Sequence, residues 1–147
     1  SLYCAYDPNG NLFLDGYSTS ESFILVELPK GSSTFTTIAL DRHIHSPGSV
    51  QWDGKALAIE DAGASRSSTA VIYRFAINGS RGRKVSATTL TDSAGDAQFL
   101  IHGSTVIGPL SYSAGQGIGF WRFPRGGVPI STIPTYSRPT GETISLK

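Results

Sequence analysis

Short apolar segments alternate with polar turns along the chain, and the stretch YDPNGNLFLDG at residues 6–16 sets the pattern. Apolar residues precede Asp7, an Asn-Gly pair stands at 9–10, and Leu-Phe-Leu follows at 12–14. An Asn-Gly pair between two apolar runs is a strong signal for a β-hairpin. Apolar positions do not recur at a 3.6-residue period for long enough to predict a helix. The pattern therefore predicts an all-β protein.

The same pattern returns at intervals of roughly 45–50 residues, which indicates three repeated units. Matching positions turn the first hairpin of each unit and end its fourth strand: Gly10, Gly54 and Gly103 for the turns, and Leu40, Leu90 and Ile133 for the ends. Four strands per unit at this period are typical of propeller blades rather than of a sandwich. Strands such as FILVEL and AVIYRF are apolar almost throughout, as expected where stacked blades bury both faces of a sheet.

We therefore predict one β-propeller segment over residues 1–147, a half-ring of three four-stranded blades. The blades are expected at about 2–41, 47–90 and 96–133. The tail, 138–147, matches the first strand of a unit and is expected to supply the inner strand of a further blade.

A half-ring leaves a large apolar face at each end, which a monomer in solution does not tolerate. We expect a second copy of the chain to close a six-bladed ring, or an N-terminal half that this sequence lacks to complete it. The residues predicted to make this contact are Leu2, Tyr3, Ile144 and Leu146.

The phrases CAYDPNGNLFLDG and HSPGSVQWDGKALAIED resemble the NHL-type repeat family, and the chain looks like the C-terminal half of secreted bacterial propeller proteins of the NHL or YVTN type. This resemblance covers nearly the whole chain but implies architecture and not chemistry. It implies an extracytoplasmic location and turn or loop roles for four residues: Asp7, Asp15, Asp53 and Asp61. The third unit departs from the pattern, with His102 before the glycine of its first turn and Gly108-Pro109 in place of the acidic residue.

Composition narrows the range of partners. Charged residues make up 16% of the chain and the net charge is +1, which gives no field that would attract nucleic acid or an anionic membrane. No apolar run is long enough to span a bilayer. Cys4 is the single cysteine, so it forms no internal disulfide, and we expect it to be a small buried residue. The basic run at 81–84 (RGRK) is expected in a solvated turn between the third and fourth strands of unit two.

Two kinds of candidate binding residue lie in the predicted rim loops. His43 and His45 form a His-x-His motif between units one and two, close to Asp41, and such a pair can bind zinc or copper. The sequence shows no third ligand, and a solvated loop is the alternative. Tyr17 and Tyr112 follow the second strands of units one and three, where exposed tyrosines can bind a glycan or a peptide.

These observations favour a non-catalytic binding or assembly scaffold, with no catalytic residue and no cofactor. A lactonase-like metal-dependent hydrolase on a six-bladed propeller is the alternative from the enzyme class. Its metal site would need carboxylates along the inner strands, where the sequence offers them only at the ends, in Asp7, Asp53 and Glu142. A jelly-roll lectin or coat-type domain would suit the length but would not explain three units with matching turns.

Overall fold

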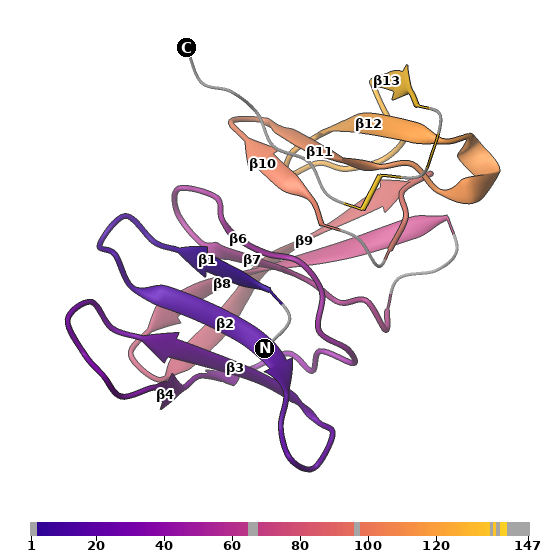
Figure 1. The fold of residues 1–147 in the computed structure, drawn as a ribbon. Coiled ribbons are helices and arrows are strands. Elements are labelled where there is room, and N and C mark those ends of the chain that lie inside the picture. The colour runs from indigo at the N-terminus through magenta and orange to yellow at the C-terminus, as the bar shows by residue number, and fades with distance from the viewer. Residues whose placement is uncertain (1–2, 65–67, 96–97, 136, 138, 141–147) are drawn as a thin grey trace.

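The fold is entirely β in the part of the chain that the computed structural model describes, residues 3–64, 68–95, 98–135, 137 and 139–140. These described residues form thirteen strands in three sheets and one short 3-10 turn, Tyr112–Ala114 (Figure 1). They include no helix whose length and hydropathy would allow it to cross a membrane.

Each sheet is built mainly from strands that follow one another along the chain. Sheet one contains, in order, β1 (Cys4–Tyr6), β2 (Leu12–Tyr17), β3 (Phe23–Leu28) and β4 (Thr36–Thr37). Sheet two contains β6 (Val50–Trp52), β7 (Leu57–Glu60), β8 (Thr69–Asn78) and β9 (Arg81–Thr91), and β5 (Ala39–Leu40) joins β9 in parallel. Sheet three contains β10 (Leu100–His102), β11 (Thr105–Pro109), β12 (Gly117–Arg122) and β13 (Ser131–Pro134). All other neighbouring strands are antiparallel.

Aspartates close the first hairpins of sheets one and two. Asp7 Oδ1 accepts the backbone N–H groups of Asn9 and Asn11 at 2.9 Å. Asp53 Oδ1 accepts those of Lys55 and Ala56 at the same distance. Burial raises the pKa of both carboxyls, but these hydrogen bonds, joined in Asp53 by the Arg74 side chain, hold each pKa below its ordinary value. The turn role that the family resemblance implies is confirmed for both residues.

The hairpin between β8 and β9 is shorter than the sequence suggested. Asn78 pairs with Arg81, so only Gly79 and Ser80 form the turn, and Gly79 has a positive φ of 55°. A two-residue turn of this kind favours glycine because its backbone is left-handed. The basic run at 81–84 therefore begins β9, and its predicted placement in the turn is wrong.

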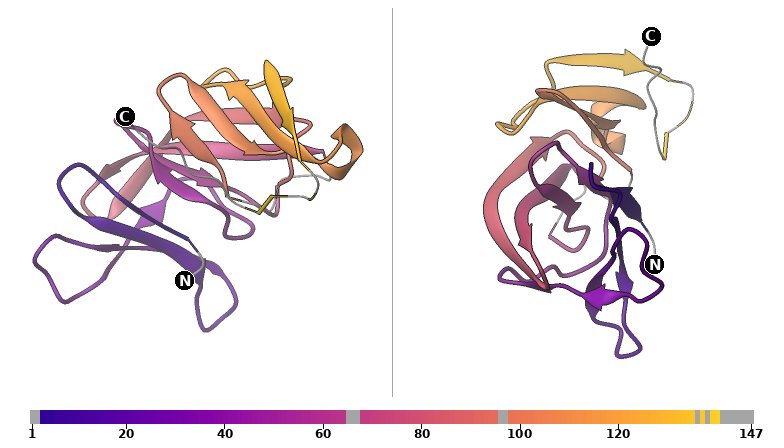
Figure 2. Two further views of the ribbon diagram at one scale, coloured as in Figure 1. Left: turned by 45° about the horizontal axis from the view of Figure 1, so that its top comes forward. Right: turned by 90° about the vertical axis from the view of Figure 1, so that its left-hand side faces the viewer.

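Sheet two lies between the other two sheets (Figures 1 and 2). Along β7, Leu57 and Ile59 join the apolar cluster shared with sheet one, while Ala58 between them joins the cluster shared with sheet three. The first cluster contains Phe13, Leu25, Ile38, Ile44, Val50, Leu57, Ile59, Tyr73 and Phe75. The second contains Ala58, Ala70, Ile72, Leu90, Phe99, Ile101, Val106, Leu110 and Trp121. Because neighbouring side chains on a strand point to opposite faces, sheet two is buried on both sides.

Trp121 has the largest of the fully buried side chains in the described residues and belongs to the second cluster. Its side chain is fully buried, and its Nε1 donates a hydrogen bond to the Thr91 carbonyl at 2.8 Å, which links sheet three to sheet two. Gly119 leaves room for the ring, because a Cβ at that position would lie 2.3 Å from Trp121 Cη2. Trp121 is therefore buried between sheets two and three.

Cys4 differs from its prediction. It is exposed, because it lies on the edge strand β1 opposite Leu14, on the face of sheet one that turns away from Phe13 and sheet two. The expectation of a buried cysteine is therefore wrong. A sequence pattern of alternating faces does not say which face another sheet will cover.

Replacing Trp121 by alanine is expected to reduce the free energy of unfolding by about 3–5 kcal/mol, because the cavity would lie between two sheets. Urea denaturation followed by circular dichroism measures the change. Tyr17→Ala, at a side chain 53% exposed, is the matched control and should alter stability by less than about 0.5 kcal/mol. A Trp121→Ala effect as small as the control would mean that the indole is not packed between the sheets.

Candidate functional site

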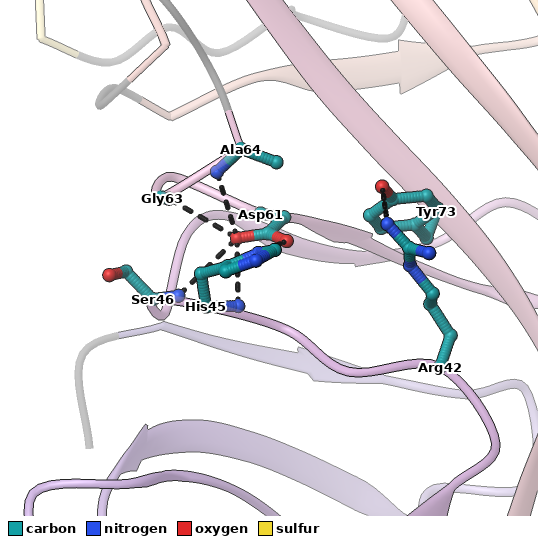
Figure 3. A network of polar contacts seen from close by, with 7 residues as sticks. All are labelled: Arg42, His45, Ser46, Asp61, Gly63, Ala64 and Tyr73. Carbon is teal, nitrogen blue, oxygen red and sulfur yellow. Dashed lines mark hydrogen bonds and ion pairs between the residues drawn. The ribbon is translucent and has the colours of Figure 1, made fainter.

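The linker between β5 and β6 brings two histidines and one carboxylate together. His45 Nδ1 lies 2.8 Å from Oδ2 of Asp61, in the turn after β7 (Figure 3). The His45 side chain is 52% exposed, whereas that of Asp61 is completely buried. The ring of His43 stands edge-on to that of His45, with the ring centroids 4.9 Å apart and the planes at 78°. The structure thus confirms that the His-x-His motif lies in the linker between units one and two, and it places the two rings close together.

Asp61 holds the linker against the turn after β7. Its Oδ1 accepts backbone N–H groups from both segments, at 3.0 Å from His45, 3.3 Å from Ser46, 3.2 Å from Gly63 and 3.1 Å from Ala64 (Figure 3). A carboxylate that accepts several N–H groups fixes the conformation of both segments, because each group would otherwise need another partner. The loop role implied for Asp61 is confirmed.

Gly63 permits this close approach. A Cβ at Gly63 would lie 2.5 Å from the Cβ of His45, a distance that two side-chain carbons do not adopt. The two segments also share a hydrogen bond from the Ala62 N–H to the Ser46 carbonyl at 3.2 Å. The position of His45 therefore depends on a glycine and an aspartate that belong to the turn after β7.

Asp41, the acidic residue nearest to the histidines in the sequence, has a different partner. Its Oδ1 accepts the backbone N–H of Lys84 at 2.7 Å, on β9. Sequence proximity suggested Asp41 as the neighbour of the pair, while the structure gives that place to Asp61, sixteen positions from His45. The signal for Asp61 was its place after the second strand of unit two, in the Asp-Ala-Gly stretch at 61–63.

Arg42 attaches the same linker to sheet two. Its Nη2 donates a hydrogen bond to the Tyr73 hydroxyl at 2.9 Å, and its guanidinium carbon lies 5.0 Å from the centroid of the Tyr73 ring (Figure 3). The Nζ of Lys84 lies 5.8 Å from the same centroid. A cation within about 6 Å of an aromatic ring is attracted to its face. The linker is therefore attached to sheet two before the two histidines, through Arg42, and to the turn after β7 at His45 and Ser46, through Asp61.

A hollow of about 400 Å³ lies beside His43, and its lining includes Phe23, Leu25 and Ile38. Tyr17 stands opposite Phe23 in the β2–β3 pair and is 53% exposed, so it lies near this hollow. Tyr112 begins the 3-10 turn beside sheet three, and its side chain lies outside the described part of the structure. Tyr17 thus belongs to sheet one and Tyr112 to a turn beside sheet three, and glycan or peptide binding by either remains a prediction.

One edge strand from each of the three sheets contributes to a second pocket, of about 360 Å³. Its walls come from β1, β6 and the segment that enters β10: Cys4, Ala5, Tyr6, Val50, Gln51, Trp52, Gln98, Phe99 and Leu100. Two side chains join β6 and the residue before it to the start of β10, because Ser49 Oγ accepts the N–H of Phe99 at 3.3 Å and Gln51 Oε1 accepts that of Ile101. The edge strands β1, β6 and β10 therefore converge on this pocket.

Most of the predicted assembly residues cannot be placed. Leu2, Ile144 and Leu146 lie outside the described residues. The Tyr3 N–H donates to the Asp15 carboxylate, and the Tyr3 carbonyl accepts the Asp15 N–H. The Tyr3 side chain packs against the cluster between sheets one and two, so it makes contacts within this chain. Near the tail, the Thr140 carbonyl accepts the N–H of Gln98 at 3.2 Å.

Asp15 is a second buried carboxyl between elements, and it is 1% exposed. Its Oδ1 accepts the N–H of Tyr3 at 3.1 Å, and its Oδ2 accepts that of Gly48, before β6, at 3.2 Å. Burial raises the pKa of Asp15 to about 7, because it disfavours the charged form more than these hydrogen bonds favour it. The turn or loop role implied for Asp15 is wrong, since Asp15 lies in β2, where its carboxyl connects sheet one with the segment that enters sheet two.

The raised pKa of Asp15 predicts that stability falls with pH. Between the ordinary aspartate pKa of 3.8 and about 7, the folded chain keeps a proton that the unfolded chain has released. The free energy of unfolding should therefore fall as pH rises through this window, and the contribution is lost above pH 7. Urea denaturation of the wild type at pH 4 to 8 measures this fall.

Asp15→Asn is the matched variant, because an amide fills the same space and does not titrate. Its unfolding free energy should lack the part of the fall that Asp15 contributes. Glu27, whose pKa is also raised by burial, is present in both proteins, so the difference between the two curves reports Asp15 alone. Parallel curves over the whole range would contradict the assignment.

No protein-family model, curated protein or solved structure matches this chain. The resemblance of its repeats to the NHL-type family therefore stays a prediction that rests on the residues of its first two units. The function has to be inferred from the arrangement of the sheets, of the linker between β5 and β6, and of the surfaces at the two ends.

Proposed function

We propose that the chain is an arc of a β-propeller and acts as a non-catalytic binding or assembly scaffold, whose ring a second copy of the chain completes. The consecutive order of strands within each sheet supports this architecture over a jelly roll, in which strands distant in sequence pair. The convergence of β1, β6 and β10 on one pocket supports it as well, because the innermost strands of propeller blades surround a central channel.

A repeated contact between neighbouring sheets also supports the proposal. After β4, the chain leaves sheet one, and Ala39 and Leu40 pair in parallel with Arg81 and Gly82 at the start of β9. At the end of β9, Leu90 forms a parallel bridge with Gly127, which precedes β13 in sheet three. The outer strand of one sheet thus reaches the outer hairpin of the next in both cases, as expected for successive units of a repeat.

The observation that carries the proposal is the exposure of apolar side chains on the two end sheets. Ile133 in β13 of sheet three is 51% exposed, and Val128 and Ile130, in the segment that leads into β13, are 65% and 52% exposed. Ile133 pairs with Ile118 on the face opposite to Trp121, so that face does not contribute to the cluster with sheet two. On sheet one, Tyr6 is 66% exposed and pairs with Leu12, on the face opposite to Phe13.

A second copy fits these end faces because they are apolar faces of sheets, and the sheets inside the chain already pack on one another through such faces. Sheet two packs one apolar face on sheet one and the other on sheet three. Sheet three of one copy against sheet one of the other extends this stacking, and the two-fold axis repeats the contact at the opposite end. A chain segment carrying further blades is the other occupant that this surface would accept.

Solution mass tests the proposal directly, by light scattering after size exclusion. We expect twice the chain mass of 15.6 kDa. Ile133→Glu and Tyr6→Glu should each return the mass to that of one chain, because each would bury an unpaired charge at the contact. Val85→Glu, at an exposed residue of sheet two, is the matched control and should leave the mass unchanged. A wild type that stays monomeric would reject the second copy as the occupant.

A further inference from the structure

We propose that His43 and His45 form an open binding site for a divalent transition-metal ion that prefers imidazole ligands, with Zn²⁺ as the reference ion. Each histidine contributes one ring nitrogen, and Asp61 is the positioning residue behind His45. The site lies in the linker within one chain, so the inference does not depend on how the ring is closed.

The distance between the two rings suits a shared metal ion. Zinc binds imidazole nitrogen at about 2.0–2.1 Å, so two rings on one tetrahedral ion have centroids about 5 Å apart. The centroids of His43 and His45 are 4.9 Å apart. Both residues are on the surface, so a metal ion can reach them without opening the fold. The two ring centroids are thus as far apart as those of two imidazoles on one tetrahedral ion.

Asp61 determines which nitrogen of His45 is available. Its carboxylate accepts four backbone N–H groups at Oδ1, and its Oδ2 faces His45 Nδ1 at 2.8 Å. Because a carboxylate only accepts hydrogen bonds, Nδ1 carries the proton and Nε2 keeps its lone pair in the neutral ring. Histidines that bind metals usually donate their other N–H to a carboxylate in this way, which orients the ring and makes it a better ligand.

The contrast in exposure between Asp61 and His45 supports a role for His45 beyond fixing the linker. Asp61 is completely buried and fixed, while the imidazole that it orients is 52% exposed. The described residues contain no group of three or more His, Cys, Asp or Glu side chains placed to hold a metal ion. Water or an added ligand would therefore complete the coordination, as in sites that keep open positions.

The chain has only three histidines, which makes a residue-specific test possible. Zinc is titrated into the full chain, without a histidine tag, and the three imidazoles are followed by long-range ¹H–¹⁵N NMR spectra. We expect the signals of His43 and His45 to shift together and saturate, with a Kd below about 1 mM. The signals of His102, at the end of β10, should not shift.

Variants of the three histidines provide the comparison. His43→Ala and His45→Ala, both at exposed side chains, should each weaken zinc binding at least tenfold, whereas His102→Ala should bind as the wild type does. The ¹⁵N shifts of the zinc-free protein should show His45 with its proton on Nδ1. Asp61→Asn should alter this tautomer and weaken binding about 10- to 100-fold.

The proposal fails if zinc at about 1 mM shifts neither His43 nor His45, or if all three histidines respond alike, since that indicates non-specific binding. It also fails if the two alanine variants keep wild-type affinity. Backbone amide spectra show whether Asp61→Asn retains the fold. If they change widely, the His45 tautomer of the wild type decides whether Asp61 positions the ring.

Discussion

A β-sheet with apolar side chains on both faces is stable in water only if something covers each face, and sheet two is a sheet of this kind. Leu57 and Ile59 face sheet one, while Ala58 and Ile72 face sheet three. The burial of these side chains from water on two sides is the main favourable contribution that the arrangement can provide. The two apolar faces of sheet two therefore determine where sheets one and three pack, and the connecting segments must span the distances that result.

The same constraint explains the polar groups at the junctions. A linker that runs between packed sheets carries backbone N–H groups that need partners. Asp15 supplies one for Gly48 before β6, and Asp61 supplies two for the linker residues His45 and Ser46. These buried carboxyls fix the linker relative to the strands. Asp15 does so at the cost of its own ionisation, since burial raises its pKa to about 7.

The candidate metal site follows from this fixation. His45 and His43 are exposed, but the segment that carries them is held by Asp61 on one side and by the contact of Arg42 with Tyr73 on the other. In a surface loop without such anchors, two imidazoles would adopt many conformations. Bringing them together around a metal ion would then cost conformational entropy and lower the affinity for the ion. In this chain the contacts of Asp61 and Arg42 hold the linker in place and so reduce this loss of affinity.

The amino-acid sequence by itself determined the local structure: the β class, the hairpin turns at Asp7 and Asp53, and the strands apolar on both faces. Those features depend on neighbouring residues, on turn chemistry and on a period of two. Only the tertiary structure decided that Cys4 is exposed, that residues 81–84 begin β9, and that Asp61 rather than Asp41 holds His45. Each of these depends on which face is covered, where a turn ends, or which distant segment packs alongside. Contacts between residues far apart in the chain are set by the packing of whole sheets, and a local pattern does not specify the partner.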